Sequence, residues 1–542
     1  MTNIKFPRKQ FEAQLGQKIT KETEEKISLF GTPLEYLTAE EIEIEIFPNR
    51  PDLLSLQGYI RAFKAFLGKS PGLKRYKLEK PKLNYRVSIA SSVKSVRPFT
   101  VCAIVTQLQF NDEKIKEIID LQEKLHTTIG RKRKKVAIGI YPLEKITLPI
   151  SYKALPPEKI KFQPLEETKE LTARQILNRH PAGKEYRHLL EDKDLFPIFT
   201  DAKSRVLSMP PIINSHETGK VTENTKEIFV ECSGNHLPTL KKTLNIIITT
   251  LAEMGGKPHQ MVLDYRDKKL LTPDLTPEKI HINPENINSL LGIKLKETDL
   301  ARLLQKMGYN YENKTCLVPA WRTDILHEVD IAEDVAIAYG YDNFKPEIPN
   351  IQTFGSEDKK EKFKSKLREI LLGLGLTEVL SYHLIKKEEA RLSQIKEKIE
   401  VRDSKTEYKI LRPNLLIPAL RILAQNKDHE YPQETFEIGT VFSREDKEQT
   451  GIKETESLCI TLAPSNFTKI KQILDYLAAS FNFKYQLNEL NHPQLIEGRT
   501  GEITINNTPS GYLGEVHPQT LKNWTIKMPL AVLEISLEEI FR

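Results

Sequence analysis

Four acidic residues lie close together in the stretch VPAWRTDILHEVDIAEDVAIAYGY, residues 318–341. They are Asp324, Asp330, Glu333 and Asp334. Carboxylates this close repel one another, so the cluster must be solvated, cap a helix, face basic side chains or hold a hard cation. Magnesium and calcium are the cations that oxygen ligands alone suit, whereas acids in a first helical turn also simply complement the helix dipole. Spacing alone therefore leaves two hypotheses open, a metal site and a solvated acidic helix face.

Two further groups could do chemistry. The stretch SMPPIINSHET, residues 208–218, ends in Asn214, His216, Glu217 and Thr218, which could orient a water or recognise a small amino group. A plain surface turn uses the same residue types. The run RKRKK, residues 131–135, is either a solvated surface or a patch that contacts phosphates.

The acidic cluster needs a helix to position it. From His327 onward the spacing of Ile331, Val335 and Ala338 predicts one apolar face, with Asp330, Glu333 and Asp334 grouped on another. Residues 273–346 form a compact unit of two strands and two helices ahead of this helix, and Gly308 is a natural helix end.

The rest of the chain predicts three more domains. In residues 1–82 we expect a helical segment over 9–30 and then a half-buried strand, EIEIEIF at 41–47, with its acids outward and its isoleucines inward. Residues 85–265 alternate short apolar runs with helical pieces, which indicates an α+β domain. Residues 357–542 begin with an amphipathic helix, and runs such as EVLSYHLI and ETFEIGTVF then give at least six strands of an antiparallel sheet.

Composition describes a soluble, globular protein, and the pattern of predicted strands and helices makes it a multidomain α+β protein. At 542 residues, 39% hydrophobic and 29% charged, the chain is long enough for three to five domains at about 150 residues each. We expect a cytoplasmic protein without a membrane segment, because the sequence has neither a long apolar run nor the apolar core of a signal peptide. The four widely separated cysteines predict buried apolar side chains, and a net charge of +7 permits a nucleic-acid partner without requiring one.

Several stretches together resemble the β subunit of phenylalanine-tRNA ligase in its archaeal and eukaryotic cytosolic form. They occur in the family's order: FPNRPDLLSLQGYIRAF, LHTTIGRKRKKVAIG, LSMPPIINS with VTENTKEIFVECSG, the acidic stretch, and LRPNLLIPALRILAQN followed by YPQETFEIGTVF. The resemblance implies an N-terminal module (1–82), a domain that edits tRNA mischarged with tyrosine (85–265), a small magnesium-binding module (273–346) and a catalytically degenerate class II synthetase domain (357–542).

The resemblance also implies partners and ligands. Such a subunit assembles with an α subunit, as two α and two β chains, and the complex attaches phenylalanine to tRNA(Phe) with ATP and Mg²⁺. The family's magnesium ligands match Asp324, Asp330, Glu333 and Asp334, at the boundary with the α subunit. For editing, Asn214 and Glu217 are the candidate catalytic residues, although Tyr141 and Pro142 stand where a His-Asp pair is typical of the family.

The last domain lacks the arginines with which class II active sites bind ATP. Its strand counterpart reads Phe436-Glu437-Ile438-Gly439, with an acid where a cation is needed, and the closing glycine motif is missing. We therefore expect aminoacylation in the α subunit. Two alternatives stay open: a stand-alone hydrolase of mischarged tRNA, and a non-catalytic RNA-binding relative.

Overall fold

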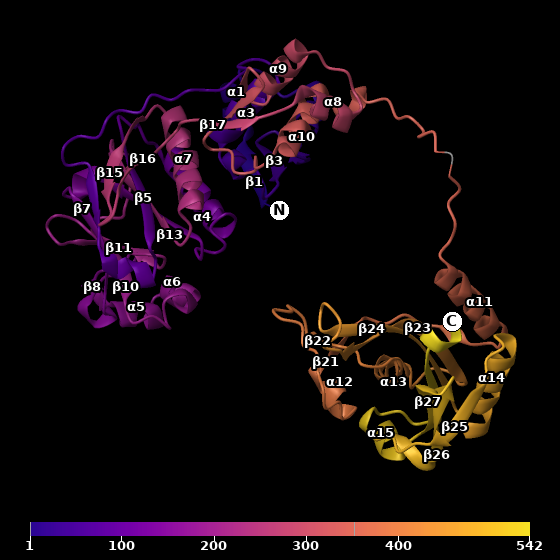
Figure 1. The fold of residues 1–542 in the computed structure, drawn as a ribbon. Helices are drawn as coiled ribbons and strands as arrows, with labels where there is room; N and C mark the ends of the chain where they lie inside the picture. Colours follow the sequence, from indigo (N-terminus) through magenta and orange to yellow (C-terminus); the bar gives the residue numbers. More distant parts are fainter. Residues whose placement is uncertain (1, 352, 542) are drawn as a thin grey trace. The chain divides into compact units, whose positions relative to one another are not determined.

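The computed structural model describes residues 2–351 and 353–541, and the chain forms two compact units, residues 1–347 and 348–542 (Figure 1). The first unit spans the first three predicted domains, and the second spans the fourth. In the described ranges, no helix is long and apolar enough to cross a membrane.

The N-terminal part of the first unit is a small antiparallel sheet, in the order β1-β3-β2, packed with helices. Its elements are β1 (Thr2–Pro7), α1 (Arg8–Leu15), α2 (Lys21–Leu29), β2 (Leu34–Leu37), β3 (Glu41–Ile46) and α3 (Leu56–Phe66). The single helical segment expected over 9–30 is two helices, because Gly16 ends α1 in the left-handed conformation (φ 77°) and Thr20 caps α2.

Strand β3 corrects one expectation. Its isoleucines are buried as predicted, but Glu43 is buried too, at 9% exposure. Asn3 of β1 donates to the Glu43 carboxylate at 3.0 Å, so the acid has a partner that its own strand's alternation could not reveal.

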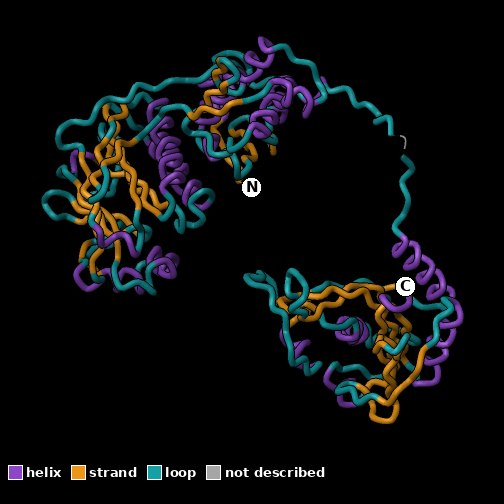
Figure 2. The backbone as a smooth tube through the Cα atoms, in the orientation of Figure 1, coloured by secondary structure: helices purple, strands orange, loops and turns teal. Residues whose placement is uncertain are grey.

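The middle of the first unit contains two large sheets (Figure 2). The first has the order β12-β11-β10-β7-β4-β15-β16, formed by β4 (Arg86–Ile89), β7 (Ile150–Leu155), β10 (Phe196–Thr200), β11 (Val206–Met209), β12 (Ile213–Asn214), β15 (Met261–Asp264) and β16 (Lys269–Thr272). The second has the order β14-β5-β13-β6, formed by β5 (Phe99–Thr106), β6 (Val136–Pro142), β13 (Ile228–Gly234) and β14 (Lys257–His259). Helix α7 (Leu237–Glu253) packs on β5 and β13, and α4 (Asp112–Thr127) packs on β6.

A smaller layer extends this region. It consists of β8 (Lys161–Phe162), β9 (Leu171–Thr172), α5 (Ala173–Arg179) and α6 (Pro181–Tyr186). Its apolar side chains form a core of their own, whereas one continuous core runs through the rest of the first unit. The modules predicted separately from sequence are thus packed into one body.

The first unit closes with the compact module that contains the acidic stretch. Its elements are β17 (Glu278–His281), α8 (Pro284–Leu291), α9 (Glu297–Lys306), β18 (Asn310–Glu312), β19 (Thr315–Val318) and α10 (Glu328–Tyr339), with sheet order β17-β19-β18. Gly308 follows α9 with φ 82°, as expected of a helix end. Strand β18 was not predicted from the sequence.

The second unit is a sheet in the order β20-β23-β24-β28-β27-β26-β25, antiparallel except for the pair β20 and β23. Its strands are β20 (Thr377–Glu378), β23 (Gln433–Arg444), β24 (Ile452–Ala463), β25 (Tyr485–Glu489), β26 (Leu495–Ile505), β27 (Thr508–Val516) and β28 (Ala531–Ser536), with β21 (Leu384–Lys386) and β22 (Tyr408–Leu411) paired apart. Its helices are α11 (Lys359–Gly373), α12 (Lys387–Leu392), α13 (Leu416–Gln425), α14 (Phe467–Ser480), α15 (Pro518–Asn523) and α16 (Glu538–Phe541). The strand predicted over EVLSYHLI is divided between β20 and β21.

Candidate functional site

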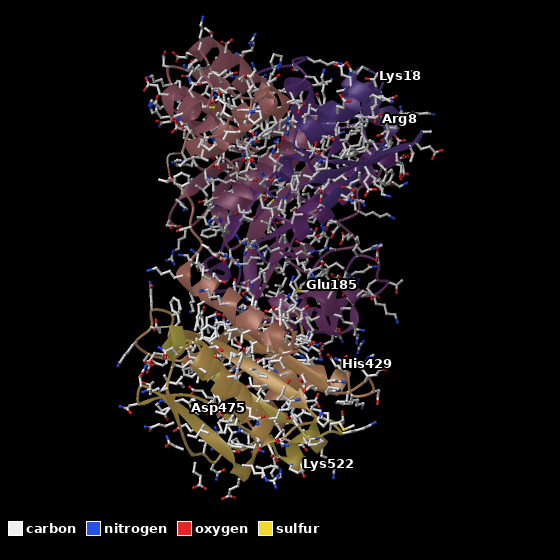
Figure 3. All side chains as sticks on the ribbon, turned by 90° about the vertical axis from the view of Figure 1, so that its right-hand side faces the viewer. Arg8, Lys18, Glu185, His429, Asp475 and Lys522 are labelled. Atoms are coloured by element: carbon white, nitrogen blue, oxygen red, sulfur yellow. The ribbon has the colours of Figure 1, made fainter. Side chains whose placement is uncertain are left out.

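A cavity of about 1090 Å³ lies between α4, β6 and the β11–β12 turn of the first unit. Its walls are mostly apolar side chains, among them Ile115 and Ile118 of α4 and Ile138 and Ile140 of β6. Glu185 of α6, labelled in Figure 3, belongs to the lining. A cavity of this volume and lining can hold a small organic ligand.

Three polar side chains meet at one side of this cavity. The Tyr141 hydroxyl lies 3.3 Å from Asn214 Oδ1 and 3.3 Å from Glu231 Oε1, and it donates to one of them at a time. Asn214 and Glu231 line the cavity, and Tyr141 is fully buried behind them. The tyrosine that departs from the family's pattern is thus part of the polar cluster.

Glu231 is a buried acid with a raised pKa. Burial raises the pKa of Glu231 to about 8, so its carboxyl is mainly protonated at neutral pH. Its second oxygen, Oε2, has no hydrogen-bond partner in the part of the chain that the structure describes. A buried, unpaired carboxyl oxygen beside a cavity is a group that a polar ligand would satisfy.

Gly139 makes room for this cluster. It lies opposite Glu231 in the β6–β13 register, and a Cβ at Gly139 would sit 2.1 Å from the Tyr141 hydroxyl oxygen and 2.7 Å from Glu231 Oε1. Any side chain larger than hydrogen would therefore displace both groups.

The side chains of the basic run over 131–135 lie in two different environments. Arg131, Lys132 and Lys134 are exposed, but Arg133 lines the cavity. Arg133 Nη1 donates to the Ile212 carbonyl at 2.9 Å, and its guanidinium stacks over a tyrosine of α6 at 4.4 Å. The run is therefore neither wholly solvated nor wholly a phosphate-contacting patch.

Of the two predicted editing residues, one faces the cavity. Asn214 does, whereas Glu217 is exposed and pairs with Arg205 at 3.1 Å. Sequence reasoning missed Glu231, although a signal existed: it is a lone acid inside IFVECSG, a strand in which every residue is buried. Its partner Tyr141 lies on the neighbouring strand and could not be paired with it from spacing.

The acidic cluster is arranged around an arginine. Nε and Nη2 of Arg322 donate to the two Asp324 oxygens at 2.9 and 2.8 Å, and Nη2 also donates to Asp334 at 2.8 Å. The Tyr309 hydroxyl donates to the same Asp334 oxygen. Helix α10 buries Ile331, Val335 and Ala338 as predicted, but Asp334 lies on the buried side with them, where Arg322 neutralises it.

The other two acids lie apart from this ion pair. Asp330 accepts the backbone N–H groups of Leu326 and His327 at 2.7 and 2.8 Å and so caps α10. Glu333 is exposed. Within the described residues, no three His, Cys, Asp or Glu side chains are grouped so as to hold a metal ion.

A second arginine–aspartate pair lies next to this one. Arg50 binds both oxygens of Asp52 at 2.9 Å, and both side chains are buried or nearly so. Burial would raise the pKa of Asp324, but Arg322 and Arg50 together lower it below its ordinary value. Thr323 also donates to the Asn49 carbonyl at 3.1 Å, so these contacts join the N-terminal and acidic modules.

In the second unit, Glu437 has a buried partner. Arg412 Nη1 donates to Glu437 at 2.6 Å, and both side chains are about 2–3% exposed. Ser381 Oγ donates to the same carboxylate at 2.7 Å. The arginine that faces this strand is therefore neutralised within the chain.

Two family models match the chain. Residues 280–341 match the tRNA synthetase B5 domain, and residues 345–537 match the phenylalanyl tRNA synthetase beta chain CLM domain. The sheet and the matched domains define the class: a subunit of an aminoacyl-tRNA synthetase.

Curated relatives define the family. The chain is 39% identical to the phenylalanine-tRNA ligase beta subunit of Thermococcus sibiricus over 91% of this chain and 90% of the relative, and 35% identical to that of Archaeoglobus fulgidus over 95% and 94%. A crystal structure of an N-terminal fragment of the Pyrococcus horikoshii subunit matches with 36% identity and a TM-score of 0.59, covering 62% of this chain and 99% of the fragment. The chain belongs to the phenylalanine-tRNA ligase β-subunit family.

Proposed function

We propose that this chain works with an α subunit, as two α and two β chains, to attach phenylalanine to tRNA(Phe) with ATP, and that the α subunit contains the aminoacylation site. The observation that carries this proposal is the match to phenylalanine-tRNA ligase beta subunits over about nine-tenths of both chains. The second unit supports it, because the strand that would contact ATP presents Glu437, whose carboxylate is paired with Arg412.

Reconstitution tests this assignment. The chain is co-purified with a phenylalanine-tRNA ligase α subunit, and charging of tRNA(Phe) is measured for each subunit and for the complex. We expect a stable complex and charging by the complex only. A chain that never binds the α subunit and still hydrolyses mischarged tRNA would instead be the stand-alone hydrolase.

The cavity of the first unit suits a second activity, hydrolysis of tRNA wrongly charged with tyrosine. An aromatic ring can lie against the isoleucines of α4 and β6, and its phenol group can reach the polar side formed by Asn214 and Glu231. The unpaired Glu231 Oε2 would gain a hydrogen bond from, or donate one to, that phenol. Phenylalanine would leave this oxygen unpaired, which is how a buried polar site rejects the analogue that lacks a hydroxyl.

The reaction itself is ester hydrolysis. A water oxygen bonds to the carbonyl carbon of the tyrosyl ester, the bond from that carbon to the tRNA ribose oxygen breaks, and free tyrosine and tRNA leave. Asn214 Oδ1 accepts from the Tyr141 hydroxyl, which leaves the amide N–H₂ of Asn214 to recognise the phenol group of the bound tyrosyl ester. The test is deacylation of Tyr-tRNA(Phe) and Phe-tRNA(Phe) by the full chain, with hydrolysis expected for the tyrosyl ester only.

A magnesium site is the third part of the proposal. Asp324 and Asp334 are engaged by Arg322, so Glu333 and the remaining oxygen of Asp330 are the groups free to meet a cation, together with groups of the α subunit. Magnesium needs six oxygens in near-octahedral geometry and retains several waters, which suits a site completed at a subunit boundary. Equilibrium dialysis with Mg²⁺ should detect this site in the complex and not in the chain alone.

A further inference from the structure

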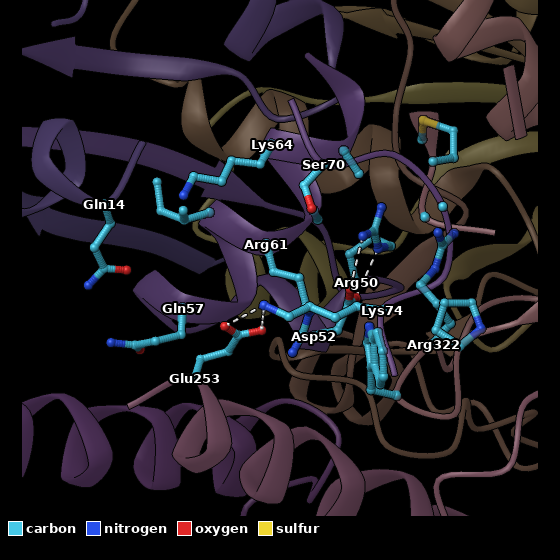
Figure 4. Close-up of a pocket in the computed structure, with 18 of the residues that line it drawn as sticks. Gln14, Arg50, Asp52, Gln57, Arg61, Lys64, Ser70, Lys74, Glu253 and Arg322 are labelled. Atoms are coloured by element: carbon cyan, nitrogen blue, oxygen red, sulfur yellow. Dashed lines mark hydrogen bonds and ion pairs between the residues drawn. The ribbon is translucent and has the colours of Figure 1, made fainter. Parts of the chain in front are cut away.

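A second cavity, of about 430 Å³, lies inside the first unit where α3, the end of α7 and residues 307–322 meet (Figure 4). Its lining is rich in cations. The basic side chains are Arg50, Arg61, Lys64, Lys74, Lys114 and Arg322.

The acids around the cavity do not balance these cations. Asp52 pairs with Arg50, Glu253 pairs with Lys74, and Arg322 is shared by the two aspartates of the acidic stretch. Six cations thus meet four carboxylates, which leaves an excess of two positive charges. Three of the cations, Arg61, Lys64 and Lys114, have no acidic partner among the described residues, and Lys114 reaches only backbone carbonyls. The net excess is two because Arg322 contacts two carboxylates.

Arg61 has an unsatisfied donor in this cavity. Its guanidinium stacks over Trp321 at 4.3 Å, and its Nη1 donates to the Tyr76 hydroxyl at 3.0 Å. Its Nη2 is buried, and no described residue accepts from it. A buried guanidinium nitrogen normally has an acceptor, because the unpaired group loses its hydration without compensation.

Two neighbours of Arg61 on α3 also lack partners for polar side-chain groups among the described residues. Lys64 lies one helical turn further along α3 and has no acidic partner within the described ranges. Gln57 Oε1, one turn earlier, is buried and receives no donor from any described group. Arg61, Lys64 and Gln57 therefore offer donors to an anion and one acceptor for a hydroxyl of that anion.

We propose that this cavity binds a phosphate group. An oxyanion with two negative charges matches the excess of two cations, and the arginine fork pairs well with phosphate oxygens. The P–OH of hydrogen phosphate would donate to Gln57 Oε1. The site is separate from the cavity between α4 and β6 and does not rest on the function proposed above.

Calorimetric titration of the full chain with inorganic phosphate and with pyrophosphate, at constant ionic strength, tests the proposal. We expect one saturable site per chain for at least one of the two anions. Arg61→Gln should weaken binding about ten-fold and Lys64→Gln about three-fold, since each removes a charged donor. The matched control is Lys9→Gln, which removes an exposed lysine outside the cavity and should leave the affinity unchanged.

The source of the phosphate is settled by competition. If unacylated tRNA(Phe) displaces pyrophosphate from the wild type, the bound group is an RNA backbone phosphate, and if it does not, the ligand is a free phosphate or pyrophosphate. Lys64→Gln keeps the test informative if Arg61→Gln does not fold. No saturable binding of either anion, or an equal loss in Lys9→Gln, would overturn the proposal.

Discussion

Replacing Arg322 by Met should strongly destabilise the first unit. The substitution removes the cation that contacts Asp324 and Asp334 at 2.8 Å, in a place where the three side chains are only 2%, 10% and 7% exposed. Because water cannot reach the two buried carboxylates to hydrate them, they are left without a counter-charge. The expected loss is about 3–5 kcal/mol of unfolding free energy. With a denaturant slope of roughly 3 kcal/mol per molar urea, the unfolding midpoint should fall by about 1–2 M.

Tryptophan fluorescence can follow this unit alone. The chain has two tryptophans, Trp321 next to the mutated site and Trp524 in the second unit, so a Trp524→Phe background isolates the signal of the first unit. The matched control is Arg302→Met, which breaks an exposed pair with Asp299 and should cost at most about 1 kcal/mol.

The same experiment has a pH dependence. The pKa of Asp324 is lowered in the folded chain, so the stability it contributes is present above its ordinary pKa and is lost as pH falls through the lowered folded value. The difference in unfolding free energy between wild type and Arg322→Met should therefore become smaller below about pH 4. A loss of under about 1 kcal/mol at neutral pH would refute the view that Arg322 holds these acids.

Three further outcomes are expected. Gly139→Ala should reduce Tyr-tRNA hydrolysis more than about ten-fold with an unchanged circular dichroism spectrum, because its Cβ would displace Tyr141 and Glu231; unchanged hydrolysis would count against the cluster. The folded-state pKa of Glu231 is raised to about 8. The stability that the protonated Glu231 contributes is therefore fully present below its ordinary pKa and is lost as pH rises to about 8. The unfolding free energy, measured in urea across this pH range, should fall with rising pH in the wild type and lose this dependence in Glu231→Gln. An identical pH dependence in both would contradict the raised pKa of Glu231. Glu333→Ala should leave the stability of the chain within about 0.5 kcal/mol but weaken magnesium-dependent association with the α subunit, whereas Asp330→Ala should also cost about 1 kcal/mol through the lost helix cap. Unchanged association of Glu333→Ala would leave that residue an ordinary exposed side chain.

Local structure was predicted correctly where it depends on side-chain periodicity and on the backbone preferences of single residues. The apolar face of α10 and the helix end at Gly308 follow from side-chain spacing and backbone preference, both of which reside in a short stretch of sequence. Helical spacing also places Asp334 beside Ala338 on the buried face, contrary to the predicted grouping with Asp330 and Glu333. What spacing could not show is its partner Arg322, which lies outside the helix.

The polar side of the cavity between α4 and β6 could not be predicted without the fold. Glu231, Gly139 and Tyr141 come together only through the register of β13 with β6, and residue spacing does not specify which strands pair. Arg133 is similar: it is one of five consecutive cations, and a run of left-handed residues over 131–133 accompanies its inward position against Ile212. Composition could not distinguish it from its exposed neighbours.

The most direct test of the editing proposal compares Asn214→Ala with Glu217→Ala in the hydrolysis of Tyr-tRNA(Phe) by the full chain. Asn214 lies on the cavity side beside Tyr141, whereas Glu217 is exposed and paired with Arg205. We predict a loss of about ten-fold or more for Asn214→Ala and wild-type hydrolysis for Glu217→Ala. Hydrolysis that is unchanged in Asn214→Ala, or lost equally in both variants, would contradict the placement of the editing site in this cavity.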